Sequence, residues 1–490
     1  MLFTSAEFVL FFSFVFLLYW LVLKNSLILQ NLFLLAAGYF FYGWWSWKFL
    51  LLLIAVSLVN WLAGLWMAAS SVVAHRRMIL VAGLLINTGT LVVFKYYNFF
   101  MEGFVSSMKA LGIPVQASTL GLLLPVGISF YIFVGISYIV DVYRRKLEPE
   151  KKIIPAMLSF SFFPVILAGP VERPVALLPQ VNGARVFDAE LAVDGIRQFV
   201  WGLFMKMVVA NNCGVFTGKV FNSAGQMPGI SLLLGAIFFA VQIYADFSGY
   251  SDMAIGIGKM LGFRIRRNFA FPYFAGDIAE FWRRWNISLT SWFRDYIFLP
   301  VAYFISGRIR QARFLFIKTE LFIYIMAILI TWTLTGLWHG ANYTFILWGM
   351  IHGLMLIFYH IIRKPKQRLL RRMHPFPGFL LRAAEYLLTM LVVLAAWVFF
   401  KSAGIHQAFD FLAGIFSSSE TDLAGPLPRV ELVVASAVAF LVEFIQRNRE
   451  FPLQLGQRVP TIVRWTCYYG IVLVIVFFGG GQKEFLYFQF

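Results

Sequence analysis

The sequence predicts an all-α integral membrane protein, a bundle of about 11–13 transmembrane helices. Hydrophobic residues fill 60% of the 490 positions and charged residues only 13%, whereas soluble domains average roughly 25% charged residues. The mean hydropathy of +0.78 points the same way. Because so few charges would not cover the surface of a water-soluble protein of this length, we expect one integral-membrane domain over 1–490.

Apolar segments long enough to cross a bilayer recur along the whole chain. A span needs about 20 mostly apolar residues. The candidate spans are 6–23, 27–43, 49–69, 78–95, 120–140, 195–211, 230–261, 319–338, 343–362, 383–400, 430–446 and 463–479. Segment 153–169 is also apolar, but prolines interrupt it at Pro155 and Pro164, so a re-entrant segment buried in protein is the alternative to a span there.

Basic residues cluster in the loops between the candidate spans and give a net charge of +18. The clusters are Arg76–Arg77, Arg144–Lys152, Arg264–Lys318, Arg363–Arg372 and Arg447–Arg464. An even number of spans separates successive clusters, so all five lie on one side, and excess Lys and Arg in short loops mark the cytoplasm. Both termini then face outward. Because the charges sit between spans, they suit anionic lipid headgroups, and we expect no nucleic-acid partner.

Several classes of site are excluded by missing patterns. The two cysteines, Cys213 and Cys467, provide neither a disulfide framework nor a cysteine-ligated metal site. The sequence contains no GxxxxGK[ST], HExxH, GxSxG or CxxC pattern. Gly256, Gly258 and Gly262 lack dinucleotide-binding spacing, and close helix packing explains them better.

A first polar cluster lies inside the long apolar stretch 230–261. Asp246, Tyr250 and Asp252 fall within it, and ionisable groups inside a span are expensive unless they meet partners or a water-filled cavity. A substrate tunnel and a buried network that locks helices together remain open as interpretations of these residues.

A second cluster follows in the cytoplasmic segment 280–296. Trp282, Trp285, Leu289, Phe293 and Tyr296 recur at helical spacing and predict one amphipathic helix with an aromatic stripe. The arginines beside this stripe are Arg283, Arg284 and Arg294. Asn286 lies close to the stripe, where a helix resting on the membrane surface needs no amide.

A third cluster surrounds two histidines on opposing arms of a predicted helical hairpin. Trp338 and His339 end the first arm, the segment 340–343 reads as its turn, and His352 lies on the second arm. Most histidines on apolar faces are hydrogen-bonded core residues, but each of these precedes a glycine and lies deep between cytoplasmic loops. We expect no metal site, since no carboxylate completes one. A neutral imidazole acting as general base fits better.

Together these segments resemble the membrane-bound O-acyltransferase (MBOAT) family, closest to the branch that contains the alginate O-acetyltransferase membrane subunit and related exported-glycan O-acetyltransferases. The matching strings cover about 125–355. They include Pro125–Tyr131, Tyr138–Tyr143, Ala168–Pro174, Tyr244–Gly256, Asn268–Tyr273, Trp282–Pro300, Leu337–Gly340 and Trp348–Gly353. The resemblance implies that His339 is catalytic. At Asn286 the bacterial branch usually has His, so this position departs from the branch pattern. We expect Asn286 to be catalytic as well, with its amide polarising the thioester carbonyl in one site with His339.

The resemblance also implies a reaction, a donor and partners. An acyl group, expected to be acetyl, would pass from a cytoplasmic thioester such as acetyl-coenzyme A toward an exported polysaccharide, with no permanently bound cofactor. A tunnel lined by Asp246, Tyr250, Asp252, Trp282, Arg283, Arg284, Arg294, Trp338 and His352 would hold the substrates. A separate periplasmic acyltransferase would receive the group, and the chain would be a multi-pass protein of the bacterial inner membrane.

Two other classes remain as alternatives. A transporter or flippase would also carry carboxylates inside the membrane, although it commonly shows inverted repeats, and the sequence has none. A scaffold subunit of a polysaccharide-secretion complex would not need a histidine at mid-membrane.

Overall fold

The structure is a computed structural model, and it describes residues 1–116, 119–314, 316–417, 425–455, 459–481 and 485–486. These residues form two compact units. The first comprises 1–199 and 253–266, and the second comprises 200–252 and 267–486.

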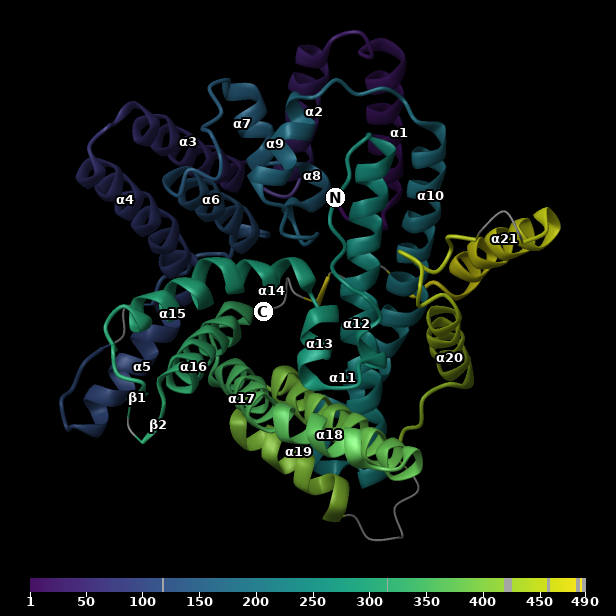
Figure 1. Ribbon diagram of the computed structural model, residues 1–490. Helices are drawn as coiled ribbons and strands as arrows, with labels where there is room; N and C mark the ends of the chain where they lie inside the picture. The colour runs from purple at the N-terminus through teal and green to yellow at the C-terminus, as the bar shows by residue number, and fades with distance from the viewer. Residues whose placement is uncertain (117–118, 315, 418–424, 456–458, 482–484, 487–490) are drawn as a thin grey trace. The chain divides into compact units, whose positions relative to one another are not determined.

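The first unit is entirely helical in its described part (Figure 1). Its helices are α1 (Ala6–Leu17), η1 (Leu18–Val22), α2 (Leu27–Gly43), α3 (Trp47–Ala69), α4 (Val73–Leu91), η2 (Val92–Tyr96), α5 (Tyr97–Ala110), α6 (Ile128–Tyr143), α7 (Ile153–Phe160), α8 (Phe163–Ile166), α9 (Pro174–Asn182) and most of α10 (Ala189–Leu203). Two of these helices, α3 and α4, are joined by buried side-chain amides. Asn60 of α3 and Asn87 of α4 exchange hydrogen bonds of 2.8 and 3.2 Å.

The second unit holds the remaining elements and the histidine hairpin. They are η3 (Phe204–Ala210), α11 (Asn211–Asn222), η4 (Ala224–Gln226), most of α12 (Gly229–Met260), η5 (Pro272–Phe274), α13 (Ile278–Arg284), α14 (Ile287–Phe293), η6 (Arg294–Phe298), α15 (Leu299–Ser306), β1 (Arg313–Phe314), β2 (Ile317–Lys318), α16 (Thr319–His339), α17 (Tyr343–Arg372), α18 (Pro375–Lys401), α19 (Ile405–Ser417), α20 (Val430–Ile445) and α21 (Thr461–Phe478). The two strands pair antiparallel as a small hairpin.

The all-α membrane fold is confirmed. Within the described residues, eight helices are long and apolar enough to cross a membrane. Four of the predicted spans are shorter helices of 16 or 17 residues, namely 6–22, 27–43, 128–143 and 430–445. The chain is therefore a multi-pass membrane protein.

Two predicted helices begin or break at other places than expected. The predicted span 120–140 becomes helical only at Ile128, because Pro125 and Gly127, whose φ is +73°, keep the preceding chain non-helical. The predicted single helix over 280–296 was wrong. It is two short helices, α13 and α14, separated at Asn286, whose φ of 42° is left-handed. Its aromatic stripe packs into the unit, since Trp285 is 1% and Leu289 3% exposed.

The hairpin of α16 and α17 is confirmed, and small residues set its closeness. A Cβ on Gly349 would lie 2.2 Å from the carbonyl oxygen of Trp332, and one on Gly336 would lie 2.2 Å from that of Phe345. Glycine is therefore required where the two backbones meet, as in membrane helix pairs generally. The predicted turn is closed by Asn342, whose side chain accepts from Thr344 N at 3.1 Å.

Candidate active site

A cavity of about 390 Å³ lies within the second unit. It contains both residues that the sequence singled out for catalysis, Asn286 and His339. Its α16 wall runs from Tyr324 to His339, which is about 22 Å along a helix at 1.5 Å per residue. The facing wall comes from α13, α14 and η6 and includes Trp282, Arg283, Asn286, Leu289, Thr290, Phe293, Arg294 and Phe298.

His339 is the last residue of α16 and is only 4% exposed. Three aromatic rings surround its imidazole, with centroid distances of 4.7 Å to Trp338, 4.8 Å to Trp348 and 5.1 Å to Phe400. The ring is therefore enclosed by aromatic side chains where it meets the cavity.

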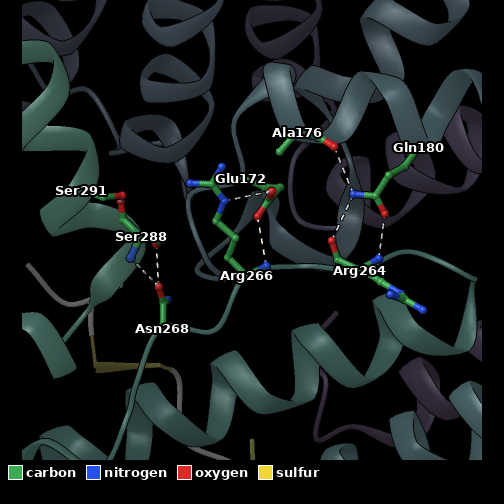
Figure 2. A network of polar contacts seen from close by, with 8 residues as sticks. All are labelled: Glu172, Ala176, Gln180, Arg264, Arg266, Asn268, Ser288 and Ser291. Atoms are coloured by element: carbon green, nitrogen blue, oxygen red, sulfur yellow. Dashed lines mark hydrogen bonds and ion pairs between the residues drawn. The ribbon is translucent and has the colours of Figure 1, made fainter.

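Two backbone hydrogen bonds fix the position of Asn286 at the junction of α13 and α14. Ala270 N donates to the Arg284 carbonyl at 2.9 Å, and Ile287 N donates to the Asn268 carbonyl at 2.8 Å. The Asn268 side chain also holds this junction, since it accepts from Ser288 Oγ at 2.5 Å (Figure 2). It donates to Ser251 Oγ at 3.1 Å as well. Asparagine also tolerates the left-handed backbone that the junction imposes at Asn286.

Within the first unit, polar side chains fix the segment that leads to Asn268. Gln180 exchanges hydrogen bonds of 2.8 and 3.1 Å with the backbone of Arg264 (Figure 2). Glu172 accepts from Arg266 N at 3.3 Å and pairs with its guanidinium at 3.8 Å. Burial raises the pKa of Glu172 to about 7, although Arg266 opposes that shift. These contacts give the Ala168–Pro174 string a structural role.

The three arginines of the cytoplasmic segment separate into two groups. Arg283 and Arg294 are exposed and line the cavity. Arg294 donates to Asp295 at 2.8 Å, and this hydrogen bond raises the pKa of its guanidinium. Arg284 is absent from the cavity wall and pairs with Glu280 of its own helix at 2.5 Å. Only Arg283 and Arg294 are therefore placed to meet a ligand of this cavity.

Trp282 lines the cavity, whereas Trp338 and His352 lie behind its wall. Trp282 donates from Nε1 to His352 Nδ1 at 3.3 Å, and the His352 ring lies 5.0 Å from Trp348. His352 is fully buried. This places His352 in the packing that supports the wall and away from the cavity, whereas the tunnel implied by the family resemblance included both His352 and Trp338.

The polar residues of α12 do not line the cavity. Asp246 forms a buried ion pair with Lys206 of η3 and also accepts from Leu486 N at 2.7 Å. Tyr250 packs against Phe485 with ring centroids 5.0 Å apart. Neither these two residues nor Asp252 belongs to the cavity wall. For Asp246, the helix-locking interpretation fits the observed contacts better than the tunnel interpretation.

The sequence interpretation missed several residues of the site. Asn268 holds the Asn286 junction, and Lys206 neutralises Asp246; neither partnership can be read from spacing, because 18 and 40 positions separate the partners. The cavity residues of α16, in contrast, could have been found from their spacing in the sequence. They share one helix face, because they recur every three or four positions at Tyr324, Ile328, Thr331, Thr335 and His339, with Trp332 next to Thr331.

Two other features bear on what the site holds. Among the described residues, no group of three or more His, Cys, Asp and Glu side chains is arranged to hold a metal ion. A larger space of about 1180 Å³, bounded by η3, α11, α20 and α21, is mostly apolar. It contains no predicted site residue, so its size alone does not make it the reaction site.

A buried histidine and the amide-bearing turn at Asn286 thus share one cavity of a multi-pass helical protein. The model of the membrane-bound O-acyltransferase family matches residues 144–396. The chain belongs to this family and is an O-acyltransferase.

Relatives narrow the class further. The chain is 34% identical over 487 residues to a protein described as a probable alginate O-acetylase AlgI of Pseudomonas putida, covering 94% of each chain. It is 31% identical to the peptidoglycan O-acetyltransferase of Helicobacter pylori, covering 80% of this chain and 74% of that one. A teichoic acid D-alanyltransferase of Bacillus subtilis is 24% identical, with 49% and 59% covered.

Proposed function

We propose that the chain transfers an acetyl group from a cytoplasmic thioester, such as acetyl-coenzyme A, toward a polysaccharide outside the inner membrane. The observation that carries this proposal is the shared cavity of Asn286 and His339, with Arg283 and Arg294 exposed along the same wall. The printed names of two relatives, an alginate O-acetylase and a peptidoglycan O-acetyltransferase, support both the acetyl group and a glycan acceptor.

His339 acts as the general base in this proposal. The acceptor hydroxyl oxygen attacks the thioester carbonyl carbon while the imidazole takes the hydroxyl proton. The tetrahedral intermediate then expels the thiolate, which receives that proton, so the products are an ester and a free thiol. General-base assistance of this kind contributes roughly 10²- to 10⁴-fold in rate.

Asn286 stabilises the oxygen that becomes negative during the attack. Its amide donates a hydrogen bond toward the thioester carbonyl, and the left-handed backbone fixes where that amide lies. Aromatic walls formed by Trp282, Trp285 and Trp332 limit the access of water, which would otherwise hydrolyse the donor. Arg283 and Arg294 attract the anionic part of the donor carrier.

The arginines give a prediction with an internal control. Arg283→Ala and Arg294→Ala should each raise the KM for acetyl-coenzyme A about 2- to 5-fold with little change in kcat, the scale of an exposed charge pair. The effect should shrink above about 0.15 M salt, where the screening length is near 8 Å. Arg284→Gln should leave KM near the wild-type value, because its partner is Glu280. An unchanged KM in all three variants would leave the arginines as anchors at the lipid surface.

Topology can be checked independently of activity. Single cysteines at Arg310 and Lys366, in a background where Cys467 is serine, should resist an impermeant thiol reagent in intact cells, because both positions lie in basic clusters. The same cysteines should react after permeabilisation. Labelling of either cysteine from outside would reverse the proposed orientation of the chain, and with it the proposed direction of acyl transfer.

A second protein is expected to complete the reaction. The cavity is a poor fit for a long glycan, so we propose that a separate periplasmic acyltransferase receives the acetyl group. The purified chain, mixed with acetyl-coenzyme A and alginate alone, should acetylate little polysaccharide, as measured by released acetate after alkaline treatment. Efficient acetylation without any second protein would remove the partner from the account.

The transporter alternative has no specific support from the site. It depended on carboxylates inside α12, and Asp246 is already neutralised by Lys206. The shared cavity of Asn286 and His339 favours the enzyme over a scaffold as well.

A further inference from the structure

Three threonines of the cavity wall donate their hydroxyl protons to backbone carbonyl oxygens four or five positions earlier in the chain. On α16, Thr331 Oγ1 lies 2.6 Å from the carbonyl oxygen of Ala327, and Thr335 Oγ1 lies 2.8 Å from that of Thr331. On α14, Thr290 Oγ1 lies 3.3 Å from the carbonyl oxygen of Trp285. A carbonyl oxygen only accepts, so in each contact the threonine donates its single hydroxyl proton.

The hydroxyl oxygens of these threonines can still accept hydrogen bonds. A hydroxyl oxygen has two lone pairs in addition to its proton. Thr331 and Thr335 are one helical turn apart, about 6 Å along α16, and both are buried. Much of the surrounding wall is apolar and includes Ile328, Trp332, Leu289, Phe298 and Leu356. A ligand in this stretch therefore meets hydrogen-bond acceptors on an otherwise apolar surface.

We propose that Thr331, Thr335 and Thr290 determine donor specificity by accepting hydrogen bonds from amide N–H groups of the arm that carries the thioester. This inference rests on the proposed function and adds the part of the donor that is recognised. An amide-containing arm, whether that of coenzyme A or the same arm on a carrier protein, offers N–H donors at intervals. A plain acyl chain or an acyl phosphate offers none.

The position of the threonines agrees with this role. Thr335 and Thr331 lie one and two turns before His339, respectively, on the same face of α16. An arm that delivers its thioester to His339 must pass them. Threonines that donate to the preceding turn also serve simply to satisfy their hydroxyls in membrane helices, and the experiment has to separate the two roles.

The test compares donors that differ in amide content. Purified wild type, Thr331→Val and Thr335→Val, with acceptor and partner present, are assayed by thiol release with acetyl-coenzyme A, with S-acetyl-N-acetylcysteamine, which keeps one amide, and with S-ethyl thioacetate, which has none. Valine keeps the threonine shape and removes the acceptor. Each variant should raise the KM for acetyl-coenzyme A about 3- to 10-fold, the scale of one neutral hydrogen bond. The kcat should change little, and the KM for S-ethyl thioacetate should stay unchanged.

Two further variants complete the design. Thr331→Ser retains a hydroxyl and should restore most of the affinity for acetyl-coenzyme A. Thr88→Val removes a hydroxyl that donates to Leu84 at 2.7 Å on α4, outside this cavity, and controls for loss of such a bond elsewhere. Equal KM changes for all three donors, or none for acetyl-coenzyme A, would overturn the inference. If wild type itself consumes no thioester, the proposed function fails instead.

Discussion

Replacing His339 by alanine should abolish acyl transfer while the protein still inserts and purifies. Among the described residues, His339 is the only histidine that lines the cavity, and removing a general base costs roughly 10²- to 10⁴-fold in rate. Thiol release from acetyl-coenzyme A in the presence of acceptor and partner measures the loss. His339→Gln, which keeps more of the side-chain volume among Trp338, Trp348 and Phe400, should be equally inactive.

His352 provides the matched contrast. It is buried on the opposing arm and accepts a hydrogen bond from Trp282, so His352→Ala should lower turnover less than His339→Ala and should mainly reduce thermal stability. A nearly active His339→Ala protein would contradict the assignment of the base. An inactive His352→Ala protein, found together with an active His339→Ala protein, would also contradict this assignment.

Changes at Asn286 should have the second-largest effect. Asn286→Ala should lower turnover by about 10²- to 10³-fold, the usual cost of losing one oxyanion donor. Alanine also strains the left-handed backbone at φ 42°, by about 1–2 kcal/mol. Asn286→Gly separates the two effects, because glycine accepts this backbone and still lacks the amide. We expect Asn286→Gly to fold as stably as wild type and to be as slow as Asn286→Ala.

Two other substitutions probe the chemistry at this position. Asn286→Asp keeps the size and the turn preference but presents an acceptor in place of the donor, so it should be no faster than Asn286→Gly. Asn286→His restores the residue usual in the bacterial branch, retains a ring N–H donor and should keep part of the activity. Steady-state kcat for each purified variant is the measurement. A fully active Asn286→Gly enzyme would mean that Asn286 serves only the turn.

The sequence predicted the hairpin and its histidine because their signals are local. Helical spacing, a turn at 340–343 and glycines at contact positions all lie within about one hairpin length, and the structure has α16 ending at His339. The co-location of Asn286 and His339 was a harder prediction, since 53 positions separate them, yet both line one cavity. Their catalytic roles remain predictions.

Other parts depended on contacts that spacing does not encode. The periodicity of 280–296 predicted one helix, but the backbone pairing of Asn268 with Ile287 breaks it and turns its aromatic face inward. The α12 carboxylate Asp246 was grouped with the tunnel because its partner Lys206 lies on another element. Arg284 was grouped with its neighbours although the helix turns it toward Glu280.

The central claim is that the donor thioester lies in the 390 Å³ cavity between Asn286 and His339. Cryo-electron microscopy of the purified chain with a hydrolysis-resistant thioether analogue of acetyl-coenzyme A tests it most directly. We predict the acyl carbonyl oxygen at hydrogen-bonding distance, about 3 Å, from the Asn286 amide, with His339 beside the carbonyl carbon and the arm passing Thr335 and Thr331. An analogue whose acyl group lies elsewhere, for example in the larger apolar space beside α20 and α21, would contradict the account.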